Sequence, residues 1–249
     1  MKYLMTFSYD GTNFNGYQKQ PKERTVQKVI EDTLKEINGG VLVNLCASGR
    51  TDAGVHALSQ KAHFELDKKF ACDKLMKGIN SLLPSDVYVR KIEEVSDDFH
   101  ARFNAIGKEY IYKINMGEYN PIERNYIYQY NKKLDVNAME RGVKFFEGEH
   151  NFKSFTKAND EITDYVRVIS NTMIERDSKD INKITITFVG TGFMRYMVRN
   201  MVGLLIEIGE GKRKAEDIIN ILKQEDRTVA GKTAPACGLY LRNVLYNCK

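Results

Sequence analysis

The chain has 249 residues, of which 42% are hydrophobic and 29% are charged, so its composition excludes an intrinsically disordered protein. Lys and Arg outnumber Asp and Glu by 38 − 33 = 5, a modest excess that suits an anionic partner but is also common in proteins without one. The N-terminal residues show no signal-peptide pattern and no apolar run is long enough to cross a bilayer, so we expect a cytoplasmic protein without a membrane span.

The first half of the chain predicts strands and helices in the order of a ferredoxin-like unit. Residues 3–9 alternate as a strand, and a loop rich in glycine and aromatic residues follows at residues 10–17. Apolar residues recur at helical spacing over residues 25–37, and Gly39 and Gly40 end that helix. The remaining predicted elements are strands at residues 41–47, 57–66 and 87–95 and a helix at residues 72–83. The order β-α-β-β-α-β is that of a split βαβ unit.

The second half predicts a less regular series of strands and helices. The helix at residues 194–208 is the most apolar, with Met197, Met201 and Leu205 on one face. We expect an α/β (α+β) fold of two ferredoxin-like halves, residues 1–104 and 105–249, with a mixed or antiparallel sheet and helices on one face. Because no Pro/Ser-rich linker separates the halves, we expect them to pack tightly. The other elements expected are strands at residues 107–115, 165–176, 183–189 and 239–245 and helices at residues 136–146 and 215–223.

Neither the cysteines nor the histidines show the spacing of a metal site. No C-x-x-C pair occurs, so reduced thiols are expected in an intracellular chain. The histidines lack H-E-x-x-H and zinc-ribbon spacing, and a histidine in a turn or strand is more often structural than catalytic. We therefore predict no metal. The residues concerned are Cys46, Cys72, Cys237, Cys248, His56, His63, His100 and His150.

Residues 49–57 read G-R-T-D-A-G-V-H-A and concentrate two glycines, an Arg, an Asp and a His between two predicted strands. One interpretation is a tight turn, in which Asp52 bonds its own backbone and Gly54 takes an unusual dihedral angle. The other is functional: the glycines allow backbone or substrate to approach closely, while the loop displays one carboxylate beside one guanidinium. The pattern leaves both interpretations open, and they are compatible.

This stretch resembles the motif that carries the catalytic aspartate in the TruA family of tRNA pseudouridine synthases. Residues 49–57 match that motif without a substitution. One departure from the family lies at Asn151, where aspartate is usual, and we interpret that site as structural. Further matches follow in the family's order along nearly the whole chain. They are Tyr9-Asp10-Gly11-Thr12 with Gly16 and Gln20, Thr25-Val26-Gln27, Phe99-His100-Ala101-Arg102, Lys108 with Tyr110 and Tyr112, residues 197–203, and Ala234-Pro235-Ala236 with Gly238-Leu239.

The resemblance implies a pseudouridine synthase core with Asp52 as the catalytic residue. The reaction breaks the N1–C1′ bond of uridine, turns the uracil, joins C5 to C1′ and releases the C5 proton, so it needs no cofactor. In agreement, the sequence holds neither a G-x-x-x-x-G-K-[ST] loop nor a complete G-x-G-x-x-G run. A carboxylate nucleophile can divide a hard step into easier ones. Whether Asp52 attacks C1′, attacks the uracil ring or assists the departure of uracil stays open.

Three further residues have substrate-binding roles by resemblance. Arg199 corresponds to the arginine that pairs with the family's aspartate, a pairing that would keep Asp52 ionised. Arg50 is expected to hold the flipped nucleotide or fill the space it leaves, and Tyr110 to stack on the target uracil. On pattern alone, Arg199 could be a surface residue of an amphipathic helix and Tyr110 a core residue of its strand. Arg195, expected one helical turn before Arg199, is a candidate phosphate contact.

The partner implied by the resemblance is tRNA, with positions 38 to 40 of the anticodon arm as the usual target and a homodimer as the enzyme. The alternatives are a paralogue that modifies another RNA and a non-catalytic ferredoxin-like RNA-binding protein, although residues 61–66 do not match the RNP1 pattern. A metal-dependent deaminase or nuclease is disfavoured because the sequence shows neither H-x-E with P-C-x-x-C nor a carboxylate cluster. The basic residues that could follow the RNA backbone are Lys19, Lys22, Arg24, Lys61, Arg102, Lys108, Lys157 and Arg167.

Overall fold

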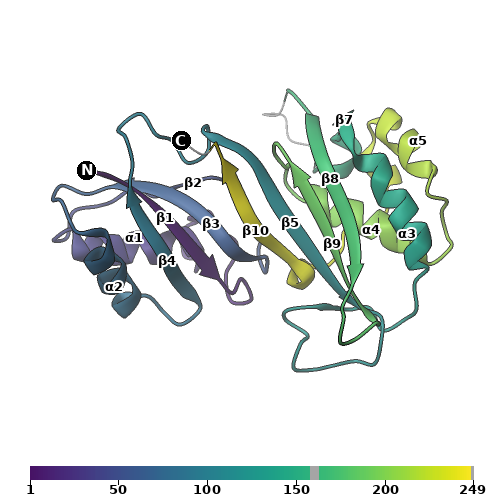
Figure 1. Ribbon diagram of the computed structural model, residues 1–249, viewed down its shortest axis with the longest axis horizontal. Coiled ribbons are helices and arrows are strands. Elements are labelled where there is room, and N and C mark those ends of the chain that lie inside the picture. Colours follow the sequence, from purple (N-terminus) through teal and green to yellow (C-terminus); the bar gives the residue numbers. More distant parts are fainter. Residues whose placement is uncertain (158–162, 248–249) are drawn as a thin grey trace. The chain divides into compact units, whose positions relative to one another are not determined.

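The computed structural model describes residues 1–157 and 163–247, and the chain divides into two compact units (Figure 1). The first unit contains Met1–Ile106 and the segment that begins at Tyr240, and the second contains Gly107–Leu239. The predicted division into residues 1–104 and 105–249 differs from the observed one in the segment that begins at Tyr240. This segment belongs to the first unit, because the last strand pairs with a strand of that unit. Within the described residues, we find no helix with the length and apolar character of a membrane span.

The first unit has the β-α-β-β-α-β order that its sequence predicts. Its elements are β1 (Lys2–Tyr9), α1 (Val26–Ile37), β2 (Cys46–Ala47), β3 (His56–Glu65), α2 (Cys72–Leu82), β4 (Val87–Glu94) and the late strand β10 (Leu239–Tyr246). Strand β1 lies between β3 and β4 and is antiparallel to both, while β2 is antiparallel to β3. The spatial order β4-β1-β3-β2 confirms the ferredoxin-like prediction. Strand β10 pairs in parallel with the start of β3, at His56 and Ala57.

The predicted strand at residues 41–47 is wrong for most of its length, because only Cys46–Ala47 pairs with β3. Val43 and Leu45 are buried, and their alternation with polar residues produced the strand pattern. The backbone N–H of Leu45 donates instead to the carboxylate of Glu31 on α1, at 3.2 Å. A buried carboxylate thus takes the donor that a longer strand would have used.

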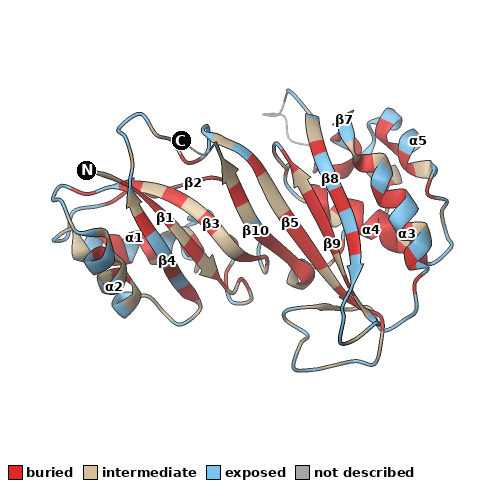
Figure 2. Cartoon of the chain, in the orientation of Figure 1, coloured by how far each residue is buried: buried red, intermediate tan, exposed pale blue. Residues whose placement is uncertain are grey.

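The two helices α1 and α2 lie on one face of the first unit's sheet (Figure 1). Tyr3, Met5 and Phe7 of β1 point to this face and are fully buried, which gives the alternating burial visible along the strands (Figure 2). On β3 the neighbouring positions Lys61 and His63 alternate to the opposite face and are half-exposed. The face without helices is therefore polar and carries cationic groups.

Among its described residues, the second unit repeats this arrangement without a strand that corresponds to β4. Its elements are β5 (Ala105–Asn115), β6 (Tyr128–Gln129), α3 (Val136–Val143), β7 (Gly148–Asn151), β8 (Val166–Arg176), β9 (Lys183–Gly190), α4 (Met197–Gly209) and α5 (Asp217–Gln224). Strand β9 lies between β5 and β8 and is antiparallel to both. The order β5-β9-β8 matches β1-β3-β2 of the first unit and confirms a second ferredoxin-like half. The short strands β6 and β7 were not predicted, since two and four residues are too few for a clear pattern.

Helix α4 starts at Met197 rather than at the predicted residue 194. Tyr196 has φ 64° and ψ −4°, a left-handed conformation that a right-handed helix cannot contain. From there onward nearly every residue of α4 is buried, including Met197, Met201 and Leu205. A helix that is apolar on all sides belongs to the interior of a unit, so α4 forms the core of the second unit.

Two helical glycines give opposite expectations for substitution by alanine. A Cβ on Gly203 of α4 would lie 1.7 Å from the carbonyl oxygen of Lys232, whereas a Cβ on Gly78 of α2 would meet no atom within 4 Å. We expect Gly203→Ala to lower the free energy of unfolding by about 1–3 kcal/mol or more through overpacking. Gly78→Ala should raise it by about 0.5–1 kcal/mol through the better helix propensity of alanine. Urea unfolding of both variants measures the difference, and equal effects would contradict the close backbone contact at Gly203.

Candidate active site

Asp52 lies in the loop of residues 48–55, which connects β2 with β3 in the first unit. Gln60, a fully buried residue of β3, fixes the start of this loop. Its side-chain oxygen accepts a hydrogen bond from the hydroxyl of Ser48 at 2.7 Å, and its nitrogen donates to the carbonyl of Gly49 at 3.1 Å. The backbone that leads to Asp52 is therefore attached to the sheet by one side chain.

A second loop, residues 10–17, holds the middle of the Asp52 loop at Thr51. The hydroxyls of Tyr9 and Thr51 are hydrogen-bonded at 2.8 Å, and the backbone N–H of Tyr17 donates to the carbonyl of Thr51 at 3.1 Å. Burial raises the pKa of Tyr9 to about 12, so its hydroxyl stays protonated at neutral pH. The residue before Asp52 is thus held through both its side chain and its backbone.

Glycine allows the two loops to approach each other. A Cβ on Gly11 would lie 2.1 Å from the carbonyl oxygen of Val55, so no larger residue fits there without moving the backbone. The N–H of Gly11 donates to Nδ1 of His56 at 3.0 Å, and the ring of His56 stacks on Tyr240 at 4.7 Å between centroids. His56 is 2% exposed, and these contacts agree with the structural role expected for it.

The loop itself closes as a tight turn. The N–H of Val55 donates to the carbonyl of Asp52 at 3.2 Å, and Gly54 has φ 76°. The N–H of Gly54 also donates to the carbonyl of Phe14 at 3.3 Å. These observations confirm the turn and the unusual dihedral angle expected at Gly54, whereas the bond expected from the Asp52 side chain to its own backbone stays a prediction. Asp52 is half-buried and Arg50 is exposed. A turn built in this way presents Asp52 on a fixed backbone, two residues after the exposed Arg50.

Tyr110 belongs to the second unit, where it lies on β5 and is 7% exposed. The edge of one aromatic ring meets the face of the other between Tyr110 and Phe193, with centroids 5.1 Å apart and planes at 72°. Tyr112, two residues along the strand, is fully buried and donates its hydroxyl to the carbonyl of Pro235 at 2.8 Å. Phe193 was not predicted from the sequence, although it lies close to the motif at residues 197–203.

Arg199 lies in the first turn of α4, in the second unit, and is half-buried. Its Nε donates to the carbonyl of Ala234 at 2.7 Å, and its own carbonyl accepts the N–H of Ala234 at 3.0 Å. Its guanidinium lies 5.3 Å from the ring centroid of Tyr196. Arg195 precedes the helix, so its expected place one turn earlier on α4 is wrong, because Tyr196 interrupts the helix between them.

Two of the predicted RNA-contacting cations are held by acidic groups of the first unit. Arg24 makes two hydrogen bonds to Asp86, at 2.8 and 2.9 Å, and lies 4.0 Å from the ring centroid of Phe14. Lys19 pairs with Glu31 at 3.0 Å. Bidentate geometry and ring contact give Arg24 a structural role in the loop that supports the Asp52 turn.

The comparison with protein families decides what these two units represent. A family model described as tRNA pseudouridine synthase matches residues 5–104 and 143–247, which is most of the chain. The chain belongs to this family. The match confirms the resemblance that the sequence motifs indicated, and it covers Asp52 in one segment and Arg199 in the other.

Relatives of known name in the family match nearly the full chain. A protein named tRNA pseudouridine synthase A from Limosilactobacillus fermentum is 44% identical over 99% of this chain and 96% of its own length. Proteins of the same name from Streptococcus mutans and Anoxybacillus flavithermus are 41% and 43% identical and cover 99% and 97% of this chain. A solved Cbf5–Nop10–Gar1 complex aligns with a TM-score of 0.34 and 11% identity, over 82% of this chain and 54% of that one. Since that score is low, the assignment depends on the family model and the named relatives.

Within this family member, Asp52 and Arg50 share one loop of the first unit, and Tyr110 and Arg199 lie in the second unit. The pairing of Arg199 with Asp52 stays a prediction. At the departure from the family pattern, the side chain of Asn151 accepts the N–H of Lys153 at 3.0 Å. That bond caps a turn after β7, in agreement with a structural role for Asn151.

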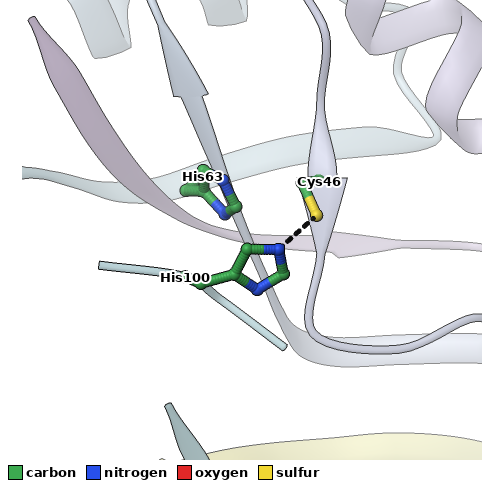
Figure 3. A group of neighbouring side chains, drawn as sticks. All are labelled: Cys46, His63 and His100. Atoms are coloured by element: carbon green, nitrogen blue, oxygen red, sulfur yellow. Dashed lines mark hydrogen bonds between the residues drawn. The ribbon is translucent and has the colours of Figure 1, made fainter. Parts of the chain in front are cut away.

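A group of three potential metal ligands lies elsewhere in the first unit (Figure 3). Ligand atoms of Cys46, His63 and His100 lie within 4.8 Å of one another. However, Nδ1 of His63 accepts the N–H of Ala101 at 3.1 Å, and Nδ1 of His100 accepts the N–H of Arg102 at 3.1 Å. Each Nε2 therefore carries the proton of the neutral ring, whereas a metal-binding histidine presents a lone pair and donates from its other nitrogen. The hydrogen bonding of these residues does not fit a metal site.

The thiols of the described cysteines agree with the predicted reduced state. Cys46, Cys72 and Cys237 are free thiols, and Cys248 lies outside the described residues. Burial raises the pKa of Cys46, while the charge of Arg102 lowers it by a smaller amount. Nε2 of His100 lies 3.5 Å from Sγ of Cys46, so the protonated nitrogen donates to the sulfur.

Two buried tyrosines beside the Asp52 loop form a matched test. Tyr9 is 4% exposed and bonds Thr51, whereas the hydroxyl of Tyr17, 3% exposed, has no hydrogen-bond partner among residues 1–157 and 163–247. We expect Tyr9→Phe to lower the free energy of unfolding by about 1 kcal/mol, and Tyr17→Phe to leave it unchanged or raise it. Equilibrium unfolding in urea measures both values. A larger loss in Tyr17→Phe than in Tyr9→Phe would show that the hydroxyl of Tyr9 does not stabilise the loop.

His63 predicts a loss of stability at acidic pH. Burial, with smaller contributions from His100 and Lys2, lowers the pKa of His63 below its usual value. The unfolded chain, with a histidine pKa of about 6.5, then binds the proton more readily than the folded protein, so stability falls as pH drops below about 6.5. His63→Asn keeps an acceptor near the N–H of Ala101 and removes the titration. Its Tm should fall less than that of the wild type between pH 7 and pH 5, and parallel curves would refute the assignment.

Proposed function

We propose that this protein converts uridine to pseudouridine at positions 38 to 40 of the anticodon stem-loop of tRNA, with Asp52 as the catalytic residue. Isomerase activity on tRNA follows from membership of the family and from relatives that share its name over nearly their full length. The choice of Asp52 is supported by its loop, in which Thr51 on one side and Val55 on the other are held by fixed hydrogen bonds. A preorganised carboxylate avoids reorganisation during the reaction.

The exposure of the two charged residues in this loop suits two different tasks. Arg50 is exposed and Asp52 is half-buried, so a nucleotide that leaves the stem would meet the guanidinium before the carboxylate. Extruding a stacked base costs about a few kcal/mol, and stacking on an aromatic ring returns about 1–3 kcal/mol. In the proposed complex Tyr110 supplies that ring, and its edge contact with Phe193 fixes the ring plane. Arg199, oriented by Ala234, would keep Asp52 ionised.

The proposed reaction uses no metal or other cofactor. Isomerisation balances without an oxidant, a reductant or a donor group: the N1–C1′ bond breaks, a C5–C1′ bond forms, C5 loses its proton and N1 takes one up. At the group of Cys46, His63 and His100, Nδ1 of each histidine is already occupied by a backbone N–H, which supports the same conclusion. The enzyme is proposed to act in the cytoplasm. It is also proposed to be a homodimer, because a folded tRNA is larger than one chain of 249 residues.

Replacing the catalytic carboxylate should separate chemistry from binding. We expect Asp52→Asn to bind tRNA within about tenfold of the wild type, because Asn keeps the size of Asp and most of its hydrogen bonds. Tritium release from C5-labelled uridine in tRNA should fall below detection, since an amide is a poor nucleophile. Asp32→Asn, which changes an exposed carboxylate on α1, is the matched control and should keep full turnover.

The outcome is decisive once mass spectrometry has excluded deamidation of the introduced asparagine back to aspartate. More than a few per cent of wild-type turnover in Asp52→Asn would mean that Asp52 is only a turn residue. Arg199→Ala, which removes the proposed partner of Asp52, should also lower turnover. Mapping pseudouridine in tRNA that has reacted with the wild-type enzyme tests the target, and modification outside positions 38 to 40 would overturn the proposed site.

A further inference from the structure

A second aromatic surface lies in the turn of residues 99–104, between β4 and β5. Phe103 is 77% exposed, although exposure of a large aromatic ring is unfavourable for folding. One face of this ring stacks on the imidazole of His100, with centroids 4.2 Å apart and planes at 27°. The exposed area therefore belongs mostly to the other face, which is open for a flat partner.

Hydrogen bonds fix the backbone that presents Phe103. Nδ1 of His100 accepts the backbone N–H groups of both Arg102 and Phe103, at 3.1 and 3.3 Å. The N–H of His100 donates to the side-chain oxygen of Asn104 at 2.6 Å, and the N–H of Asn104 donates to the carbonyl of His100 at 3.0 Å. The ring of Phe103 thus projects from a closed, internally bonded turn and not from a loose loop.

The turn is also attached to the sheet of the first unit. Nδ1 of His63 on β3 accepts the N–H of Ala101, and the hydroxyl of Tyr246 on β10 donates to the carbonyl of Ala101 at 2.6 Å. Figure 3 shows the ring of His100 next to both His63 and Cys46, which come from neighbouring strands. The edge of His100 meets His63 with centroids 4.8 Å apart. Phe103 and His100 therefore form a rigid two-ring stack.

One cation lies beside this stack, and a second lies against the ring of Tyr246, which supports the turn. The guanidinium of Arg102, which is exposed, lies 5.9 Å from the ring centroid of Phe103. The ammonium of Lys61, on the face of the sheet without helices, lies 5.0 Å from the ring centroid of Tyr246. An exposed ring with positive charge beside it is the combination that binds a nucleobase together with its phosphate. A protein partner would instead favour a broader apolar surface, and the exposed neighbours Arg102 and Asn104 are polar.

We propose that Phe103, stacked on His100, binds an unpaired base of the tRNA at a place distinct from the reacting uridine, and that Arg102 contacts an adjacent phosphate. His63, which supports the turn, follows His56 by seven residues along β3, or about 23 Å of extended strand. The Asp52 loop ends at the start of that strand, so one nucleotide does not reach both places. This inference rests on the proposed function, since it assumes tRNA as the bound RNA.

The chain contains no tryptophan, so Phe103→Trp introduces a single fluorescent reporter at the stack. Addition of an unmodified tRNA transcript should quench its emission, because a base stacked on indole quenches it. Leu82→Trp, at a 43% exposed position on the helix-covered face of the sheet, is the control and should change little. Unchanged emission of Phe103→Trp at saturating tRNA, or equal quenching of both reporters, would overturn the proposal.

Binding measurements test the energetic contribution of the same ring. Phe103→Ala should weaken tRNA binding about tenfold without changing its salt dependence, whereas Arg102→Ala should reduce the slope of log K against log salt by about one. Turnover of Phe103→Ala at saturating tRNA should equal that of the wild type, and Leu82→Ala should bind within twofold of the wild type. If Phe103→Ala binds tRNA normally and the wild type forms pseudouridine, the proposed base stacking on Phe103 is refuted and the proposed function is not. Failure of the wild type to modify tRNA would refute the proposed function instead.

Discussion

The close approach of two loops in the first unit is the constraint on which the candidate site depends. Gly11 brings the loop of residues 10–17 against the carbonyl of Val55, at a distance that leaves no room for a side chain. That approach allows backbone and hydroxyl groups of the same region to reach Thr51, directly before Asp52. The backbone at Asp52 is therefore held by backbone hydrogen bonds together with the side chains of Tyr9, Thr51 and Gln60. The sequence Tyr9-Asp10-Gly11-Thr12 is the part of the chain that makes this possible.

In the second unit, hydrogen bonds between segments distant in sequence likewise hold a candidate site residue in place. Arg199 and Ala234 are joined by a backbone bond and a side-chain bond, so the start of α4 and the segment before Pro235 hold one another. Tyr196 precedes the helix in a left-handed conformation, and such strain persists only where the surroundings over-determine it. The guanidinium of Arg199, which lies 5.3 Å from the ring centroid of Tyr196, belongs to these surroundings. Each predicted site residue of this unit is thus oriented by a neighbour distant in sequence or outside its own element.

Much of the fold could be predicted from the sequence, because long amphipathic segments such as residues 25–37 and 57–66 carry a clear period. The sequence could not show that most of residues 41–47 do not form a strand. Their conformation depends on a hydrogen bond from the N–H of Leu45 to Glu31, which lies on another element. For the site, the motif at residues 49–57 predicted a tight turn, which the structure shows, and a catalytic role for Asp52, which stays a prediction. It could not reveal Gln60 or Phe193, because their roles arise only when strands bring distant residues together.

Strand β10 has a consequence for the order in which the protein is completed during synthesis. His56, which receives the N–H of Gly11 beneath the Asp52 loop, stacks on Tyr240, and β10 pairs with β3 at this point. A ribosome makes Tyr240 long after it has made His56, so the first ferredoxin-like unit leaves the ribosome with the edge of β3 still unpaired at His56 and Ala57. Unpaired strand edges invite association with other chains. The loop that carries Asp52 thus acquires its last support only when the second unit has been translated, so a truncated chain lacks the stack of Tyr240 on His56 beneath this loop.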